Sequence, residues 1–199
     1  MSASPASAPA PRECGACSLC CKLLGVDSIS KEAGVWCSHC TTKGGCAIYA
    51  ERPQECQNFI CAWLQSPALD ERWKPSVCRF VVAPEHGGTK LKVAVDPARP
   101  DAWRKEPFYS HFKNWIRQGA SHGCELIVSI GKRTIVMLPD RDVDLGQLRD
   151  DERVAIGRAE TPFGPRFDAM KMHKDDPRAV APVASPGSVS RKDTRPPML

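Results

Sequence analysis

Nine cysteines lie in three short segments of the N-terminal third, and they are the strongest chemical signal in the sequence. The first segment reads CGACSLCC, the second WCSHCTTKGGC and the third RPQECQNFIC. Two cysteines with two residues between them can reach one ion from a tight turn, at zinc–sulfur distances of about 2.3 Å. That spacing occurs three times in the first two segments. We therefore predict that all nine thiols are metal ligands: Cys14, Cys17, Cys20, Cys21, Cys37, Cys40, Cys46, Cys56 and Cys61.

A disulfide framework is the alternative use of so many cysteines. The total of eleven is odd, and the N-terminal stretch MSASPASAPAPR has no apolar segment typical of an export signal. No run approaches the roughly 18 apolar residues of a membrane span. These features favour a cytoplasmic protein, and in that reducing compartment clustered cysteines more often bind metal or catalyse reactions than form cross-links.

The spacing within the first segment bears on the number of ions. If residues 14–21 are helical, the four sulfurs fall within an arc of about 120°. If the segment is instead a series of turns, Gly15 permits the unusual backbone angles that turns require. In both cases Cys20 and Cys21 are adjacent and cannot easily share one tetrahedral ion. We expect either two ions or a bridging thiolate.

The third segment is predicted to be a helix that begins at Pro53 and ends near Ser66. On one regular helix Cys56 and Cys61 diverge by about 140°. Both can therefore bind metal only if Cys56 lies at the frayed start of the helix or if the two thiols face different ions.

These motifs together carry a family resemblance. CGACSLCC, followed by WCSHC and GGCAIYAERPQECQNFICAW, resembles the YkgJ-type CxxCxxCC family of zinc- or iron-chelating proteins. The later part of the family pattern corresponds to Cys46, Tyr49, Arg52-Pro53, Cys56 and Cys61. The resemblance spans about residues 14–63 and implies metal binding, but it implies nothing about the rest of the chain.

The identity of the metal is open between zinc and iron. Zinc is favoured by the paired cysteines and by a local shortage of hydrophobic residues, because a bound ion supplies folding free energy. Iron, in particular a 4Fe-4S cluster, is favoured by thiol-only ligands and by the spacing of Cys14, Cys17 and Cys20. The fourth cysteine of a ferredoxin run, followed by proline, is absent. We expect a structural or metal-handling role, or alternatively a redox role, rather than an enzyme.

Residues outside the cluster are interpreted as structural. His39 is expected to be solvated or to support the ligands, and Cys78 and Cys124 to be small buried hydrophobic residues. His122 next to Cys124 is not sufficient for a nucleophile and base, which are assembled in space rather than in sequence. Four aromatic residues are expected to cover the metal from water: Trp36, Tyr49, Phe59 and Trp63.

The elements that must position this cluster are predicted to form an α+β fold, a cysteine-rich module packed on a small antiparallel sheet. Two strand pairs, VCRFVVAP with KLKVAVD and CELIVSI with RTIVMLP, are joined by glycine-containing turns. Between them EPFYSHFKNWIRQG has the apolar spacing of one amphipathic helix. The order ββ-α-ββ favours a sheet with a helix on one face.

Composition divides the chain into four parts. Residues 1–12 are expected to be disordered, 13–66 to form the metal-binding module, 67–163 to form the α+β domain, and 164–199 to be a disordered, proline-rich tail. The net charge of +5 is spread thinly, which argues against a nucleic-acid partner. The metal ion is the expected partner, with room for an unknown protein partner.

Overall fold

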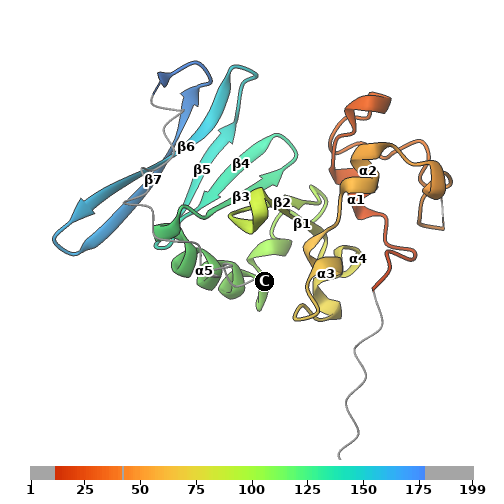
Figure 1. Ribbon diagram of the computed structural model, residues 1–199, viewed down its shortest axis with the longest axis horizontal. Helices are drawn as coiled ribbons and strands as arrows, with labels where there is room; N and C mark the ends of the chain where they lie inside the picture. Colours follow the sequence, from red (N-terminus) through yellow and green to blue (C-terminus); the bar gives the residue numbers. More distant parts are fainter. Residues whose placement is uncertain (1–11, 42, 178–199) are drawn as a thin grey trace, which may run out of the picture.

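A computed structural model describes residues 12–41 and 43–177, and shows an α+β protein built around a five-stranded sheet (Figure 1). The strands are β1 (Phe80–Glu85), β2 (Lys90–Val95), β3 (Glu125–Ile130), β4 (Arg133–Met137) and β5 (Asp142–Gln147), in that spatial order. The helix α5 (Phe108–Gly119) connects β2 to β3. Both predicted hairpins and the predicted helix are therefore present.

The sheet differs from the expected one in two respects. β2 and β3 pair in parallel, with Lys90 opposite Glu125, so the sheet is mixed and the prediction of an antiparallel sheet is wrong. The reason is that α5 carries the chain back to the same end of the sheet, as in a crossover connection. The sheet is also larger than predicted, because β5 adds a fifth strand beside β4.

Aromatic side chains attach α5 to the sheet. Phe108 and Phe112 of α5 contact Trp73, with ring centroids 4.9 and 5.5 Å apart, and Phe108 also lies 5.1 Å from Phe80 of β1. The ring pairs that Phe108 makes are edge-to-face, the arrangement that the aromatic quadrupole favours. Phe80, Trp103 and Phe112 are fully buried. The main hydrophobic core therefore lies between α5 and the sheet.

A second, two-stranded sheet follows β5. Its strands are β6 (Glu152–Thr161) and β7 (Gly164–His173), paired antiparallel throughout. The prediction of a disordered tail from residue 164 onward is therefore wrong for residues 164–173. The reason is that Phe167 and Ala169 alternate with polar residues and turn inward, which composition alone does not register. Residues 1–11 and 178–199 lie outside the described residues, as does the disorder predicted there.

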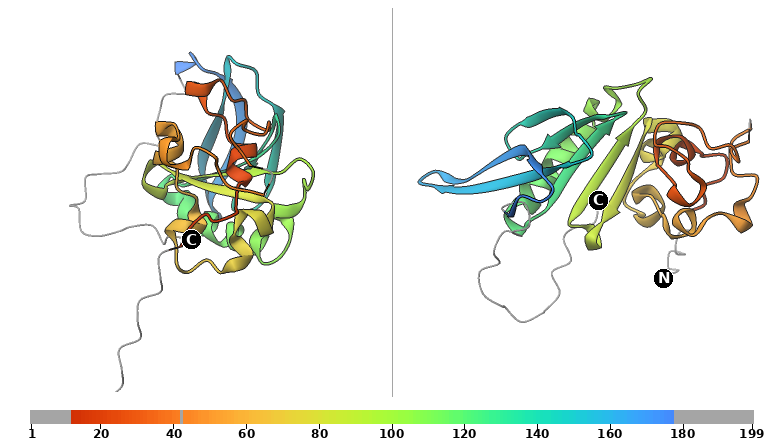
Figure 2. Two further views of the ribbon diagram at one scale, coloured as in Figure 1. Left: turned by 90° about the vertical axis from the view of Figure 1, so that its right-hand side faces the viewer. Right: turned by 90° about the horizontal axis from the view of Figure 1, so that it is seen from above.

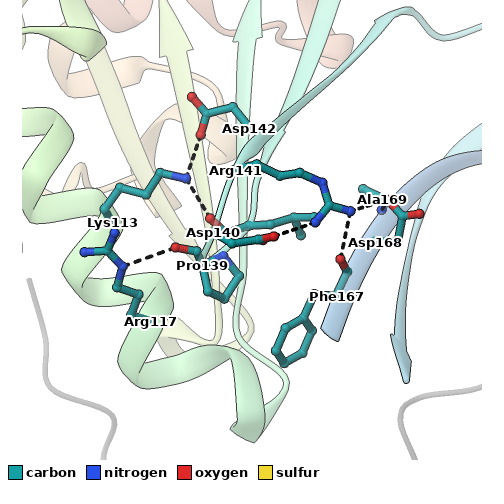
Figure 3. A network of polar contacts seen from close by, with 10 residues as sticks. Lys113, Arg117, Pro139, Asp140, Arg141, Asp142, Phe167, Asp168 and Ala169 are labelled. Atoms are coloured by element: carbon teal, nitrogen blue, oxygen red, sulfur yellow. Dashed lines mark hydrogen bonds and ion pairs between the residues drawn. The ribbon is translucent and has the colours of Figure 1, made fainter. Parts of the chain in front are cut away.

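Arg141, just before β5, joins this hairpin to the rest of the fold (Figure 3). Its guanidinium donates to the carbonyl of Phe167 at 3.0 Å and pairs with Asp168 at 2.8 Å. On the other side of the same turn, Lys113 of α5 donates to the carbonyl of Leu138 at 2.7 Å. Helix, sheet and hairpin therefore meet at one polar junction.

The cysteine-rich module lies at the opposite end of the sheet, beside β1 (Figures 1 and 2). Its helices are α1 (Leu19–Leu23), α2 (Gln54–Asn58) and α3 (Ala62–Gln65), and α4 (Pro75–Cys78) follows them. α1, α3 and α4 contact β1. The buried side chains of Leu19, Leu23 and Trp63 belong to the same hydrophobic cluster as the sheet.

A buried carboxylate also connects the module to the sheet. Asp96 directly follows β2, and its side chain is fully buried. It accepts from the ammonium of Lys22 at 2.8 Å and forms an ion pair with Arg79. Burial alone would raise the pKa of Asp96, but the hydrogen bonds, led by that from Lys22, outweigh it and lower the pKa below its ordinary value.

No helix in residues 12–41 and 43–177 is both long enough and apolar enough to cross a membrane.

Candidate metal centre

The first cysteine segment combines the two geometries that its sequence allows. Residues 14–17 form a turn closed by a hydrogen bond of 2.9 Å from the Cys17 amide to the Cys14 carbonyl. Gly15 has a φ of 52° in this turn, in the left-handed region that glycine tolerates best. Cys20 and Cys21 then lie in α1. The turn and the helix bring thiols from both ends of the segment to one side of the module.

The second segment is attached to the first by backbone contacts. The amide of Cys37 donates to the carbonyl of Cys21 at 3.0 Å, and Cys40 and Cys46 pair as an isolated β-bridge. Gly44 has a φ of 83°, and a Cβ at this position would overlap the carbonyl oxygen of Ala16. Because it has no Cβ, Gly44 therefore permits a close approach of the second segment to the first.

The third segment is not one helix, and this corrects the prediction. α2 ends at Asn58, Phe59 has extended backbone angles, and Cys61 precedes α3 with a φ of −72° and a ψ of 157°. The break between the helices removes the divergence of about 140° expected for Cys56 and Cys61 on one regular helix. Arg52 stabilises the bend by donating to the carbonyl oxygens of Tyr49 and Cys56, at 2.7 and 3.3 Å.

One group of thiols surrounds the first turn. Burial raises the pKa of Cys61, and the nearby thiols of Cys14 and Cys17 raise it further. Cys20 is also close enough to Cys14 and Cys17 for their charges to raise its pKa, after its hydrogen bond to Cys21 and its burial. We call Cys14, Cys17, Cys20 and Cys61 the first thiol group; Cys14 also lies close enough to Cys21 for that thiol to raise its pKa, after burial and Cys17.

A second group gathers around the second segment. Burial raises the pKa of Cys56, and the thiols of Cys21, Cys37 and Cys46 raise it further. Cys40 is close enough to Cys21 to lower the pKa of that thiol, and it is paired with Cys46 through the backbone. We call Cys21, Cys37, Cys40, Cys46 and Cys56 the second thiol group.

The adjacent residues Cys20 and Cys21 form the boundary between the two groups. Hydrogen donation from the Cys20 thiol to the Cys21 thiolate lowers the pKa of Cys21 and raises that of Cys20. Burial opposes the lowering at Cys21, whereas the charge of Lys31 assists it. Cys21 is therefore the thiol that this environment most favours as a thiolate.

Lys31 is a buried cation that the sequence patterns do not single out. Its ammonium donates to the carbonyl of Lys22 at 2.9 Å and to that of Leu24, and only 9% of the residue is exposed. Burial lowers its pKa, and the thiols of Cys37 and Cys21 oppose that shift. Nothing in the stretch SISKEAG distinguishes this lysine from a surface one, so only the folded contacts reveal it.

The remaining thiols and aromatic residues divide between core and surface. Cys78 and Cys124 are buried, as predicted, and burial raises the pKa of Cys78 to about 12. Trp63 is buried, but Trp36 and Tyr49 are 52% and 54% exposed. The rings of Trp36 and Tyr49 contact Lys22 and Arg52, and the covering role expected for the four aromatic residues stays a prediction.

The donor chemistry of the two groups fits a thiophilic metal, although the sulfurs do not form a closed ligand shell. All nine thiols are free, eight of them partly exposed and Cys61 buried. Within the described parts of the chain, no three histidine, cysteine, aspartate or glutamate side chains are already arranged to hold an ion. Ligation requires the side chains within each group to close further around the metal.

Comparison with known proteins gives no match: no family model, curated protein or solved structure is significantly similar to this chain.

Proposed function

We propose that residues 14–61 bind metal through cysteine thiolates, as their resemblance to the YkgJ-type CxxCxxCC family implies. The observation that carries the proposal is the convergence of thiols from three separate segments into one module that contains little hydrophobic core of its own. Thiolates bind zinc and iron strongly, and bound metal offsets a shortage of apolar burial. The same contacts support a structural or metal-handling role in which the protein holds the ion rather than transforms a substrate.

We further propose two zinc ions, one in each thiol group. Four thiolates complete a tetrahedral zinc shell, and the first group supplies four from Cys14, Cys17, Cys20 and Cys61. The second group supplies five, one more than a single ion needs. Because Cys20 and Cys21 belong to different groups, their adjacency no longer presents a difficulty.

Counting ions in cysteine variants tests this division. Native mass spectrometry of the wild type, purified without oxygen, should show about two zinc ions per chain. Cys61→Ser should lose one ion, because it leaves three thiols in the first group. Cys37→Ser/Cys56→Ser, which leaves three thiols in the second group, should lose the other ion. Cys124→Ser, which removes a buried thiol outside the module, should keep both. A single ion in the wild type would contradict the division, and a metal-free but folded wild type would contradict metal binding itself.

An iron–sulfur centre is the second candidate, favoured by the thiol-only first group with its turn at Cys14–Cys17. It predicts a brown protein with an absorption band at about 400 nm that fades in air. In that case the same counting experiment should return iron and sulfide instead of zinc. The spectrum and the elemental content together therefore distinguish a redox protein from a zinc protein.

A further inference from the structure

A cavity of about 290 Å³ lies between α4 and the loop that leads into α5, outside the two thiol groups. Its lining is unusually rich in cations: Arg72, Arg79, Arg99 and Lys105 all border it, with Glu106 as the single acid. Its volume is close to the lower end of the range of small-molecule sites, which begins at about 300 Å³. The cavity therefore has a volume that suits a small molecule, and its lining has a positive charge that suits an anion.

Two of the four cations already have carboxylate partners. Arg72 pairs with Asp70 at 2.5 Å, and Arg79 pairs with the buried Asp96. Arg99 and Lys105, in contrast, form no ion pair with any residue in 12–41 or 43–177. The charge at this opening is therefore only partly balanced from within the described protein.

The cavity is also lined by apolar side chains. Val77 is 58% exposed, although it lies between the buried residues Pro75 and Cys78 in α4. Phe108, which belongs to the aromatic core, lies against the same space. A ligand here would contact both cations and apolar side chains, the combination found in many small-molecule sites.

The backbone at the cavity is held in an uncommon conformation. Arg79 has a φ of 67°, in the left-handed region that non-glycine residues rarely adopt. It is fixed there by hydrogen bonds of 3.0 Å from its amide to the carbonyl of Pro75 and from the amide of Asp96 to its own carbonyl. Arg79 is the residue that ends α4, a position where helices commonly adopt the left-handed conformation, and it directs the chain into β1 beside the cavity.

We propose that this cavity binds a small organic anion, with a phosphate or carboxylate group at Arg99 and Lys105 and an apolar body against Val77. The fork of donors on arginine matches the oxygens of such a group, and lysine adds a point charge. The proposal does not rest on metal binding, since none of the residues that line the cavity is among the nine proposed ligands.

Amide chemical shifts measured during titration test the proposal with two probes, phenyl phosphate and inorganic phosphate. Phenyl phosphate should shift the signals of residues 77–79 and 101–106 in the wild type, and it should bind more tightly than inorganic phosphate. The double variant Arg99→Gln/Lys105→Gln should weaken binding by about tenfold or more. Val77→Ser should reduce the preference for phenyl phosphate while inorganic phosphate still binds.

The matched control is Lys132→Gln/Lys174→Gln, which removes the same charge from two exposed lysines elsewhere. It should bind phenyl phosphate as the wild type does. Equal weakening in both double variants would show nonspecific attraction to a basic protein and would overturn the proposal, as would the absence of saturable shifts at millimolar phosphate. Zinc counts in all variants should equal that of the wild type, so failure here is separable from failure of the metal proposal.

Discussion

At the scale of single residues, Gly44 is the position where the module tolerates least change. Its left-handed backbone and its approach to Ala16 press the second cysteine segment against the first. Gly34 has nearly the same φ, 84°, but no atom lies within 4 Å of the position that an added Cβ would occupy there. Comparing substitutions at Gly44 and Gly34 therefore separates the effect of backbone strain, which both share, from the effect of the close approach to Ala16, which only Gly44 has.

We predict that Gly44→Ala destabilises the protein by about 3 kcal/mol, since strain and overlap add, whereas Gly34→Ala costs about 1 kcal/mol. Gly44→Ala should also lower the zinc content, because the two segments can no longer approach. Urea unfolding and a metal count check both effects. Similar losses in the two variants would show that the approach to Ala16 has no role.

Asp96 is the second residue whose environment makes a sharp prediction. Asp96→Asn leaves Lys22 and Arg79 without their buried carboxylate, so the free energy of unfolding should fall by about 3 kcal/mol at neutral pH. Because the pKa of Asp96 is lower in the folded state, its stabilising effect is present above the ordinary value of 3.8 and is lost as the pH falls through the folded pKa.

The stability difference between wild type and Asp96→Asn should therefore be constant near neutrality and shrink below about pH 4. Urea unfolding at a series of pH values measures it. A difference that grows on acidification would mean that the carboxylate is not held in its charged form by Lys22 and Arg79.

At the scale of elements, the hairpin of β6 and β7 depends on its junction with β5. Arg141 makes the two polar contacts to β7 that Figure 3 shows, whereas the ion pair that Arg133 forms within residues 12–41 and 43–177 is with the exposed Asp144. Arg141→Ala should therefore speed amide hydrogen exchange across residues 164–173, and Arg133→Ala should not. Unchanged exchange in Arg141→Ala would show that apolar contacts of Phe167 and Ala169 hold the hairpin alone.

The elements also show how far the sequence can predict the fold. The two hairpins and α5 are predictable because alternation and helical spacing are local signals. The parallel pairing of β2 with β3 is not, because register between strands separated by a helix depends on tertiary packing. β7 escapes prediction because the proline-rich tail hides a short alternating stretch, and the break between α2 and α3 has no glycine or proline to mark it.

The site shows the same division. The spacing of the nine cysteines is enough to predict them as candidate metal ligands, but their assignment to two groups depends on contacts such as that between Cys37 and Cys21. The sequence does not predict that Lys31 and Asp96 are buried, because charged residues are usually exposed and only the folded structure shows which are not. The basic cavity likewise joins Arg72 and Arg99 from different segments, which no local pattern relates.

At the scale of the whole molecule, the two halves differ in how they are stabilised. The sheet and α5 have an extensive apolar core, whereas the module has few buried side chains. Removing zinc with a strong chelator should therefore unfold residues 14–61 while the sheet persists. Amide spectra should lose the dispersed signals of the module and keep those of β2, β3 and β4; loss of all signals together, or of none, would contradict this separation.

The contact between the module and β1 also has a consequence for biosynthesis. The ribosome completes all nine clustered cysteines before β1 is made, so α1 and α3 emerge ahead of the surface on which they finally rest. Until β1 and β2 leave the exit tunnel, the nascent module has neither the strand that its helices contact nor the carboxylate of Asp96 that pairs with Lys22. The thiols of a newly made chain are consequently most exposed to oxidants before its second half has been translated, and under the proposed metal binding that is also when an ion would protect them most.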